Sequence, residues 1–352
     1  MSVSPETCIL FVNHQEKHRS GHLGHALVEY APGKLLAFYS NCAGGRNHGH
    51  SGFGWMEYRR SLDAGKTWSE PVILQCSMDA FLDGVYSIAC EKAVCTSDGT
   101  IVVTCLRCRY QPAWEPFLSP MYIISKDFGE TWCEPREMNS EPGRIYDMII
   151  EDNTIYALHF ANDSSVSFAG NQENHRYILL ESTDNADSFH EKSVVPFDTM
   201  GRAYGALIFT DERRLLAYAY NIKDEYNLDV CESTDSGKTW KTLPHSYVAK
   251  RIRNPQLAKL GGNYYLHGRS GCESDELPRE FVLYTSKDAL HWDQGEYIHL
   301  CPEGAWGQSC FYSNNVIVHT AQGERLLIQS SVSYDEARTN ICHWWIDIQN
   351  PA

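Results

Sequence analysis

Ser61–Trp68 reads S-L-D-A-G-K-T-W, and this stretch comes back along the chain of 352 residues. Two further intact copies are S-K-D-F-G-E-T-W at 125–132 and S-T-D-S-G-K-T-W at 233–240. Two degraded copies are S-T-D-N-A-D-S-F at 182–189 and S-K-D-A-L-H-W at 286–292. The first serines, at positions 61, 125, 182, 233 and 286, are 64, 57, 51 and 53 residues apart. A period near fifty is typical of a propeller or another repeat array.

The repeated motif has a local structural explanation. Ser and Asp side chains bond to nearby backbone N–H groups and close a tight turn. Gly takes the positive-φ position that other residues avoid. Thr leads back into a strand, and Trp packs between neighbouring sheets. We therefore expect each copy to be a hairpin corner, with structural rather than catalytic aspartates.

The pattern S-x-D-x-G-x-T-W resembles the Asp-box, or BNR repeat, of the sialidase (neuraminidase) superfamily. The copies span nearly the whole chain. The resemblance implies an all-β fold, a six-bladed β-propeller formed by residues 1–352 as a single domain.

Each blade is expected to contain four antiparallel strands, with the Asp-box between the third and the fourth. In the first blade we place these strands at 26–30, 34–39, 54–60 and 71–74. The sixth blade has no Asp-box. We expect residues 8–12 to supply its outer strand, because sharing the last blade between both ends of the chain closes the ring.

Composition limits the partners and the location. The net charge of −15 argues against a nucleic-acid backbone as partner. The N-terminal sequence does not read as a signal peptide, and no stretch approaches the ~18 apolar residues of a membrane span. Thirteen cysteines are scattered through strand-like segments. For these, including the C-x-x-C pair Cys105 and Cys108, we favour buried free thiols over a redox or zinc site, and hence a cytoplasmic protein.

The predicted topology gathers polar residues on one face. Segments before the first strands and between the second and third strands share the face opposite the Asp-boxes, near the axis. The arginines there suit a carboxylate, which a guanidinium group binds through two hydrogen bonds. The candidates for substrate binding are Arg144, Arg202, Asn254, Arg269, Gln308 and Arg338.

The family resemblance transfers only some of the sialidase site residues. Arg269 and Arg338 match the second and third of the three arginines that hold the substrate carboxylate in sialidases. The stretch 22–27, H-L-G-H-A-L, stands where the first arginine is expected. The glutamate that activates the tyrosine nucleophile falls at or beside Asn254. No tyrosine follows Arg338, and residues 41–50 lack the acid/base aspartate.

Histidines stand in place of these groups, and three interpretations remain open. A histidine acts as general acid/base of a glycosidase, or His and Tyr move the proton of a uronate in a lyase. In the third, His22, His25, His48 and His50 bind a divalent metal; otherwise no cofactor is expected. The candidates for proton transfer and catalysis are His22, His25, His48, Asp147 and Tyr204.

The sequence thus predicts a sialidase-like exo-glycoside hydrolase acting on a terminal acidic sugar of an oligosaccharide. One alternative is a lyase that cleaves next to a uronate by β-elimination. Another is a non-catalytic carbohydrate-binding propeller, although the many His and Arg residues of the predicted face argue against it.

Overall fold

The Asp-box repeat forms a hydrogen-bonded corner directly after the third strand of its sheet. In blade four, Ser233 Oγ donates to Asp235 Oδ1 (2.7 Å) and accepts from Gly237 N (2.7 Å). Asp235 also accepts the backbone N–H (2.9 Å) and the hydroxyl (2.6 Å) of Thr239. The same bonds recur in the other intact copies. The aspartates are therefore structural, as predicted.

The degraded copies keep the corner with other donors. Ser188 replaces Thr and donates its hydroxyl to Asp184 (2.6 Å). In blade five, His291 Nδ1 lies 2.7 Å from Asp288 Oδ2. The tryptophans bind the neighbouring blade: Trp240 Nε1 donates to Ser193 Oγ at 2.9 Å. Each corner therefore fixes a hairpin and also its contact with the next sheet.

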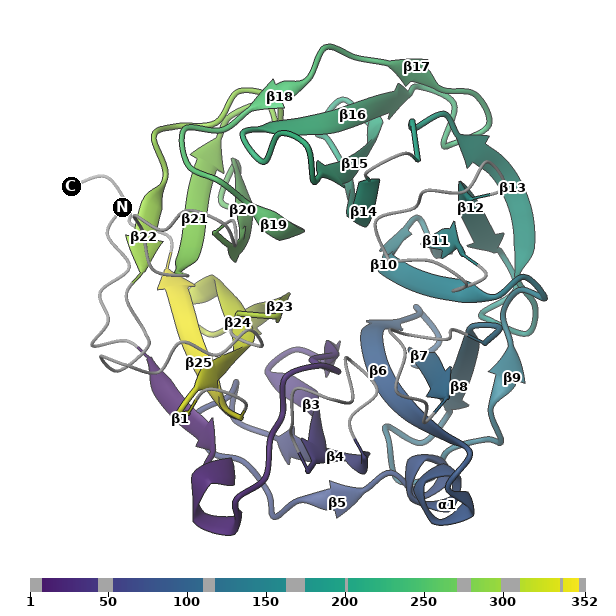
Figure 1. Ribbon diagram of the computed structural model, residues 1–352, viewed down its shortest axis with the longest axis vertical. Helices are drawn as coiled ribbons and strands as arrows, with labels where there is room; N and C mark the ends of the chain where they lie inside the picture. Colours follow the sequence, from purple (N-terminus) through teal and green to yellow (C-terminus); the bar gives the residue numbers. More distant parts are fainter. Residues whose placement is uncertain are drawn as a thin grey trace.

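The chain forms six antiparallel sheets around a central axis (Figure 1). This computed structural model describes residues 8–43, 53–109, 118–162, 175–199, 202–270, 280–298, 311–335 and 338–347. Blades one and two contain β2 (Leu27–Ala31), β3 (Lys34–Cys42), β4 (Gly54–Ser61) and β5 (Val72–Ile73), then β6 (Tyr86–Cys95), β7 (Ile101–Arg109), β8 (Met121–Ser125) and β9 (Arg136–Glu137). Blade three contains β10 (Gly143–Glu151), β11 (Thr154–Ala161), β12 (Arg176–Ser182) and β13 (His190–Val195).

Blade four differs slightly from the others, because its third strand pairs with two short outer strands. It contains β14 (Arg202–Phe209), β15 (Leu215–Asn221), β16 (Asn227–Ser233), β17 (Lys241–Thr242) and β18 (Ser246–Tyr247). Blade five contains β19 (Arg253–Leu260), β20 (Asn263–Arg269), β21 (Phe281–Ser286) and β22 (Glu296–Ile298). Blade six contains β23 (Ser313–Thr320), β24 (Gly323–Ser333) and β25 (Thr339–Asp347), followed by β1 (Ile9–Val12).

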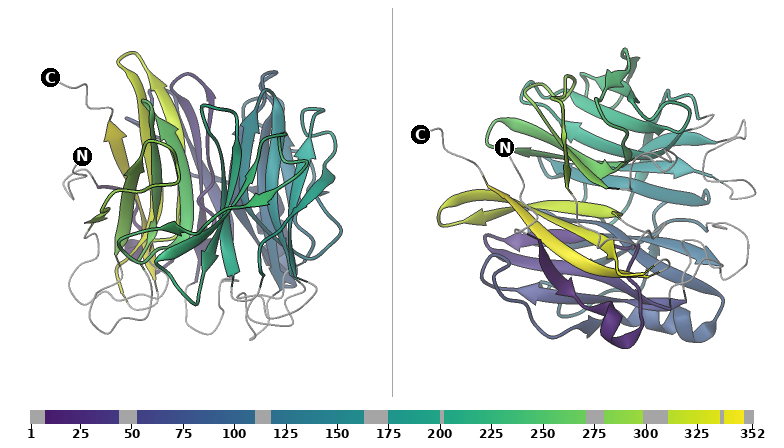
Figure 2. Two further views of the ribbon diagram at one scale, coloured as in Figure 1. Left: turned by 90° about the horizontal axis from the view of Figure 1, so that it is seen from above. Right: turned by 60° about the vertical axis from the view of Figure 1, so that its left-hand side comes forward.

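The N-terminal strand closes the ring, as predicted. β1 pairs antiparallel with β25, with Ile9 opposite His343 and Val12 opposite Ile341. Phe11 stacks on His343, with ring centroids 3.9 Å apart. Figure 2 shows this strand beside the last strand of the chain. A short 3₁₀ helix, His14–Lys17, then leads toward blade one.

The core lies between the blades. Six of the apolar clusters each join two neighbouring blades. Because both faces of a second strand such as β15 are covered, its seven residues are all buried. The first strands of neighbouring blades also contact one another around the axis. Within the described ranges, no helix is long and apolar enough to cross a membrane.

Two details differ from the sequence prediction. A helix, α1 (Gln75–Asp83), follows the last strand of blade one and packs on β4 and β6. It was not predicted, because its buried residues are only Ser77 and Ala80 and give no apolar stripe. The first strand of blade six, which the sequence pattern predicts at 310–318, begins at Ser313.

Candidate functional site

A β-bulge interrupts the first strand of blades two to five near the axis. The pairing register shifts between Cys90 and Lys92, Ile145 and Asp147, Ala203 and Gly205, and Arg253 and Gln256. The residues placed inside these shifts include Glu91, Tyr146, Tyr204 and Asn254. Tyr204 and Asn254 have positive φ values of 48° and 53°. A bulge redirects a side chain, and bulges are common next to active sites.

One residue from each of the six blades lines the same axial pocket. These residues are His25, Glu91, Tyr146, Tyr204, Asn254 and Tyr312. His25 and Tyr312 precede the first strands of blades one and six. The pocket has about 420 Å³ of empty space, with the solvent at its mouth included.

An ion pair forms part of the pocket wall. Arg144 donates from Nε (3.0 Å) and Nη2 (2.6 Å) to Glu91 Oε2. Its guanidinium carbon lies 5.4 Å from the ring centre of Tyr146 and 5.6 Å from that of Tyr204. Burial alone would lower the pKa of Arg144, but Glu91 and the two tyrosines raise it above its ordinary value. Arg144 is therefore a permanent buried cation.

Two tyrosine hydroxyls meet beside this cation. The hydroxyl oxygens of Tyr204 and Tyr312 are 3.5 Å apart. Arg269 stacks on the Tyr312 ring, with its guanidinium carbon 4.7 Å from the ring centre. Burial and Tyr312 raise the pKa of Tyr204 well above its ordinary value, while Arg144 and Arg269 act in the opposite direction. Burial raises the pKa of Tyr146 to about 12.

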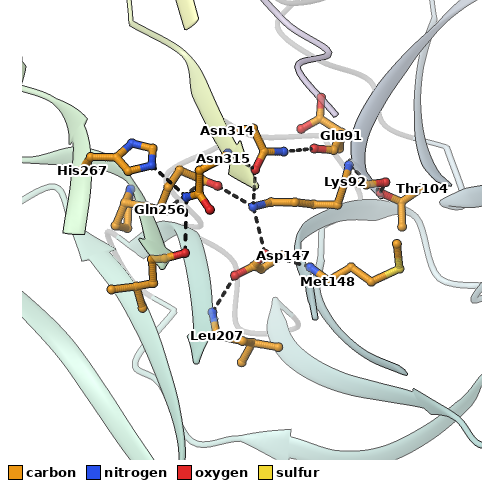
Figure 3. A network of polar contacts seen from close by, with 12 residues as sticks. Glu91, Lys92, Thr104, Asp147, Met148, Leu207, Gln256, His267, Asn314 and Asn315 are labelled. Carbon is orange, nitrogen blue, oxygen red and sulfur yellow. Dashed lines mark hydrogen bonds and ion pairs between the residues drawn. The ribbon is translucent and has the colours of Figure 1, made fainter. Parts of the chain in front are cut away.

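Lys92, which lines the pocket, forms a second ion pair with Asp147 behind the wall (Figure 3). Lys92 Nζ lies 2.9 Å from Asp147 Oδ1 and donates to Asn314 Oδ1 (2.9 Å) and to Gln256 Oε1. Asp147 also accepts the backbone N–H groups of Met148 (2.9 Å) and Leu207 (2.7 Å). The described contacts of Asp147 therefore engage both carboxylate oxygens.

Two buried acceptors of the pocket residues have no donor in the described structure. They are Glu91 Oε1 and Asn254 Oδ1. A buried acceptor without a partner is costly, and native proteins rarely leave one so. Both oxygens therefore retain the capacity to accept a hydrogen bond.

The two predicted histidines of blade one are buried and neutral. Burial lowers the pKa of His22 to about 4 and that of His25 to about 3. His25 Nε2 lies 3.1 Å from His22 O, and its Nδ1 lies 3.4 Å from Gln329 Nε2. The His22 ring centre is 6.4 Å from that of Tyr312. Both histidines therefore lie by the pocket as uncharged groups.

The other predicted site residues fall in different places. Arg338 forms an ion pair with Asp335 (3.0 Å) and donates to His18 O (3.3 Å). Arg202 is the first residue of β14. His48 and Gln308 lie outside the described residues. The structure thus brings Arg144, Asp147, Tyr204, Asn254 and Arg269 together around the axis, with His22 and His25 beside them.

Metal ligands are not grouped in the described residues. No cluster of three or more His, Cys, Asp or Glu side chains suits a metal ion there. His48 and His50, from the proposed metal set, lie outside the described ranges. Cys105 and Cys108 are buried free thiols on β7. Burial raises the pKa of Cys108 to about 12, so it stays a thiol.

Sequence reasoning missed Glu91, Lys92, Tyr312 and Asn314. In an ideal strand, successive residues point to opposite faces, so Glu91 and Lys92 would not both reach the axis. The bulge between Cys90 and Lys92 allows both to line the pocket. A positional signal was available only for Tyr312 and Asn314, which lie at the start of the first strand of blade six, whereas Glu91 and Lys92 lie in the middle of β6.

Comparison with known proteins agrees with this geometry. The family described as BNR repeat-like domain matches residues 4–246. A short match, 24% identical over 124 residues, joins the chain to an uncharacterized protein of Mycobacterium tuberculosis. That match covers 31% of this chain and 42% of the relative, so it spans less than half of either protein.

Solved structures share the fold at low sequence identity. A Dyadobacter fermentans protein of unknown function superposes with a TM-score of 0.72 and 14% identity, over 97% of this chain and all of that one. The Hadza microbial sialidase Hz136 gives 0.69 and 14%, over 96% and 68%. A Trypanosoma rangeli sialidase, solved as a covalent intermediate with 2,3-difluorosialic acid, gives 0.67 and 11%, over 97% and 60%.

The Asp-box corners and the six blades agree with the match to the BNR repeat-like domain family. At these identities the solved structures establish the fold and not the reaction. This chain belongs to the BNR repeat-like domain family, and it shares its fold with solved sialidases.

Proposed function

We propose that this protein is an exo-acting glycoside hydrolase that binds a terminal acidic sugar in the axial pocket. One observation carries the proposal: Arg144 and Arg269 flank the Tyr204–Tyr312 hydroxyl pair from two different blades. Guanidinium groups bind carboxylates, and a tyrosine hydroxyl is an established nucleophile in sialidase-type hydrolysis. These contacts support the proposal, because they bring two guanidinium groups and two tyrosine hydroxyls close together.

The reaction uses the charges already present around the tyrosines. A hydroxyl attacks best as a phenolate, and the two guanidinium groups oppose the rise that burial causes in the pKa of Tyr204. The attacking oxygen forms a bond to the anomeric carbon while the bond to the leaving group breaks, and the proton lost by the tyrosine hydroxyl goes to the leaving oxygen, which departs as an alcohol. Water then cleaves the sugar–tyrosine bond, so the products together gain one water.

The buried acceptors favour a sugar over a smaller anion. Glu91 Oε1 and Asn254 Oδ1 accept no hydrogen bond from the described chain. Ring hydroxyls of a bound sugar donate hydrogen bonds to such oxygens. A carboxylate ion such as acetate has only acceptor oxygens and donates none.

A specific observation also favours β-elimination as a second candidate. The described carboxylates of the pocket are engaged, Asp147 with Lys92 and Glu91 with Arg144. In a lyase the arginines neutralise a uronate carboxylate, and a tyrosine oxygen removes the proton from the neighbouring carbon. The leaving oxygen then takes a proton, and no water enters the products.

The test is incubation with oligosaccharides capped by sialic acid or by a uronate. Mass spectrometry detects products that gain one water, and ultraviolet absorbance detects an unsaturated uronate. The first result supports hydrolysis, and the second supports the lyase. Absence of both products, with binding retained, would overturn the catalytic proposal in favour of a binding propeller.

A further inference from the structure

A second pocket lies next to the axial one on the same face. It is lined by Tyr220, Lys223, Glu225, Tyr226, Arg251 and Arg253, among others. The two pockets share a wall, because Arg253 lines one and Asn254, the next residue, lines the other. Across the same wall, the rings of Tyr204 and Tyr220 lie 6.1 Å apart between centroids. The second pocket therefore adjoins the axial one.

We propose that this second pocket binds a carboxylated sugar that follows the terminal acidic sugar in an oligosaccharide. This inference rests on the proposed function for the terminal sugar, and it adds the chemical class of the second sugar in the substrate. It names the preferred substrate as an oligosaccharide with acidic groups on two successive sugars.

Two cations of the second pocket have no carboxylate partner in the described structure. Lys223 and Arg251 form no ion pair there, and Arg251 lies over the Tyr226 ring at 5.8 Å from its centre. Asp224, beside them, binds its own turn, accepting from Tyr226 N (3.2 Å) and from Asn227 Nδ2 (2.7 Å). The two free cations fit one carboxylate of a ligand.

The remaining wall suits the body of a sugar. Tyr226 lines the pocket and is 39% exposed as a residue, so part of its side chain is accessible to a sugar ring. Glu225 Oε1 accepts the Tyr220 hydroxyl at 2.6 Å, but Glu225 Oε2 is buried and accepts no hydrogen bond from the described residues. A sugar hydroxyl is the donor that this oxygen lacks.

The pocket is built on a rigid turn. Asn221 Oδ1 accepts the backbone N–H groups of Lys223 (3.0 Å) and Asp224 (3.2 Å). The carbonyl of Glu225 accepts the Ile252 N–H (3.1 Å), which ties the turn to blade five. Little ordering of the chain is therefore needed when a ligand binds.

The experiment compares two substrates that share one terminal acidic sugar. In the first this sugar is linked to a second acidic sugar, and in the second it is linked to a neutral one. Arg251→Ala should raise KM about tenfold for the first substrate and leave KM for the second and both kcat values unchanged. Tyr226→Ala should raise KM for both substrates. Lys66→Ala, in an exposed Asp-box turn, is the matched control and should change neither.

Equal KM changes for both substrates, or none, in Arg251→Ala would overturn the proposal. If the wild-type protein turns over neither substrate, titration calorimetry with the same two oligosaccharides separates the two questions. In that case the wild type can still bind the doubly acidic compound more tightly than the other. If Arg251→Ala loses this preference, the second pocket is supported although the hydrolase proposal fails. Equal affinity of the wild type for both compounds would reject the second pocket by itself.

Discussion

Lys92 and Asp147 come from blades two and three and meet near the axis, with Nζ and Oδ1 2.9 Å apart. Lys92 also reaches Gln256 of blade five and Asn314 of blade six. Asp147 accepts the Leu207 N–H of blade four. A single polar network therefore links five of the six blades beside the pocket.

We predict that Lys92→Met destabilises the fold. Removing one partner of a buried pair leaves the other charge uncompensated, which costs about 3–5 kcal/mol. The free energy of unfolding in urea measures this loss. Lys66→Met, in an exposed turn, should change stability by less than about 0.5 kcal/mol. Equal stability of the two variants would contradict a structural role for the network.

Tyr312→Phe should reduce kcat about 100-fold or more on acidic glycosides. The substitution removes the hydroxyl that lies 3.5 Å from Tyr204 but keeps the ring on which Arg269 stacks. Steady-state rates and the melting temperature are measured together. Tyr247→Phe is the control, since Tyr247 is 62% exposed. Full activity in Tyr312→Phe would exclude this hydroxyl from the reaction.

Arg269→Ala should lower kcat/KM for acidic substrates about 10- to 100-fold, the effect of losing a charged hydrogen bond. Arg338→Ala should have a smaller effect, because Arg338 is bound to Asp335 and to the His18 carbonyl. The comparison uses both variants on one substrate. A larger loss in Arg338→Ala would show that the third family arginine, not Arg269, dominates carboxylate binding.

Stability should fall as the pH decreases from about 6.5 to 4. Burial lowers the pKa of six histidines to about 3 or 4: His14, His22, His25, His159, His267 and His343. An unfolded chain protonates them near pH 6.5, so it binds more protons than the folded chain in this range. Each histidine lowers the free energy of unfolding by up to about 1.4 kcal/mol for each pH unit of this decrease.

Melting temperatures between pH 7.5 and 4 test this dependence. His267→Gln should flatten the slope, because a neutral amide replaces one buried titrating ring. The Asp-box carboxylates affect the pH dependence of stability only at lower pH. Hydrogen bonds lower the pKa of Asp63 and Asp127 to about 2, so their stabilisation is lost between about pH 4 and 2. A flat profile above pH 4 would contradict the burial of these histidines.

The sequence specified the fold better than the site. The Asp-box corner is local chemistry within about eight residues, so its spacing predicted a repeat array. The family resemblance implied the six blades, and the last blade without an Asp-box pointed to the closing strand β1. Arg144, Tyr204 and Asn254 were found because they lie at the start of first strands. Glu91 and Lys92 were missed because a bulge breaks the alternation of the strand. Tyr312 was missed because it precedes β23, whose predicted start was too early.

The contacts that occupy both carboxylate oxygens of Asp147 could not be predicted either. A carboxylate near the propeller axis suggests a role in proton transfer. The partners of Asp147 come from blades two and four, which are remote from it in sequence. Pairing across blades is a property of the closed ring and not of any repeat.

The closing strand makes the last blade a two-piece sheet. β1 adds only four residues to β25, and two of them, Ile9 and Leu10, are about half exposed. Phe11 supplies the main anchor through its stacking on His343 and its edge contact with Trp68, at 5.0 Å between ring centroids. A chain lacking this strand should accept it back as a separate peptide, so that blade six becomes a complementation reporter, with Phe11→Ala in the peptide abolishing the exchange.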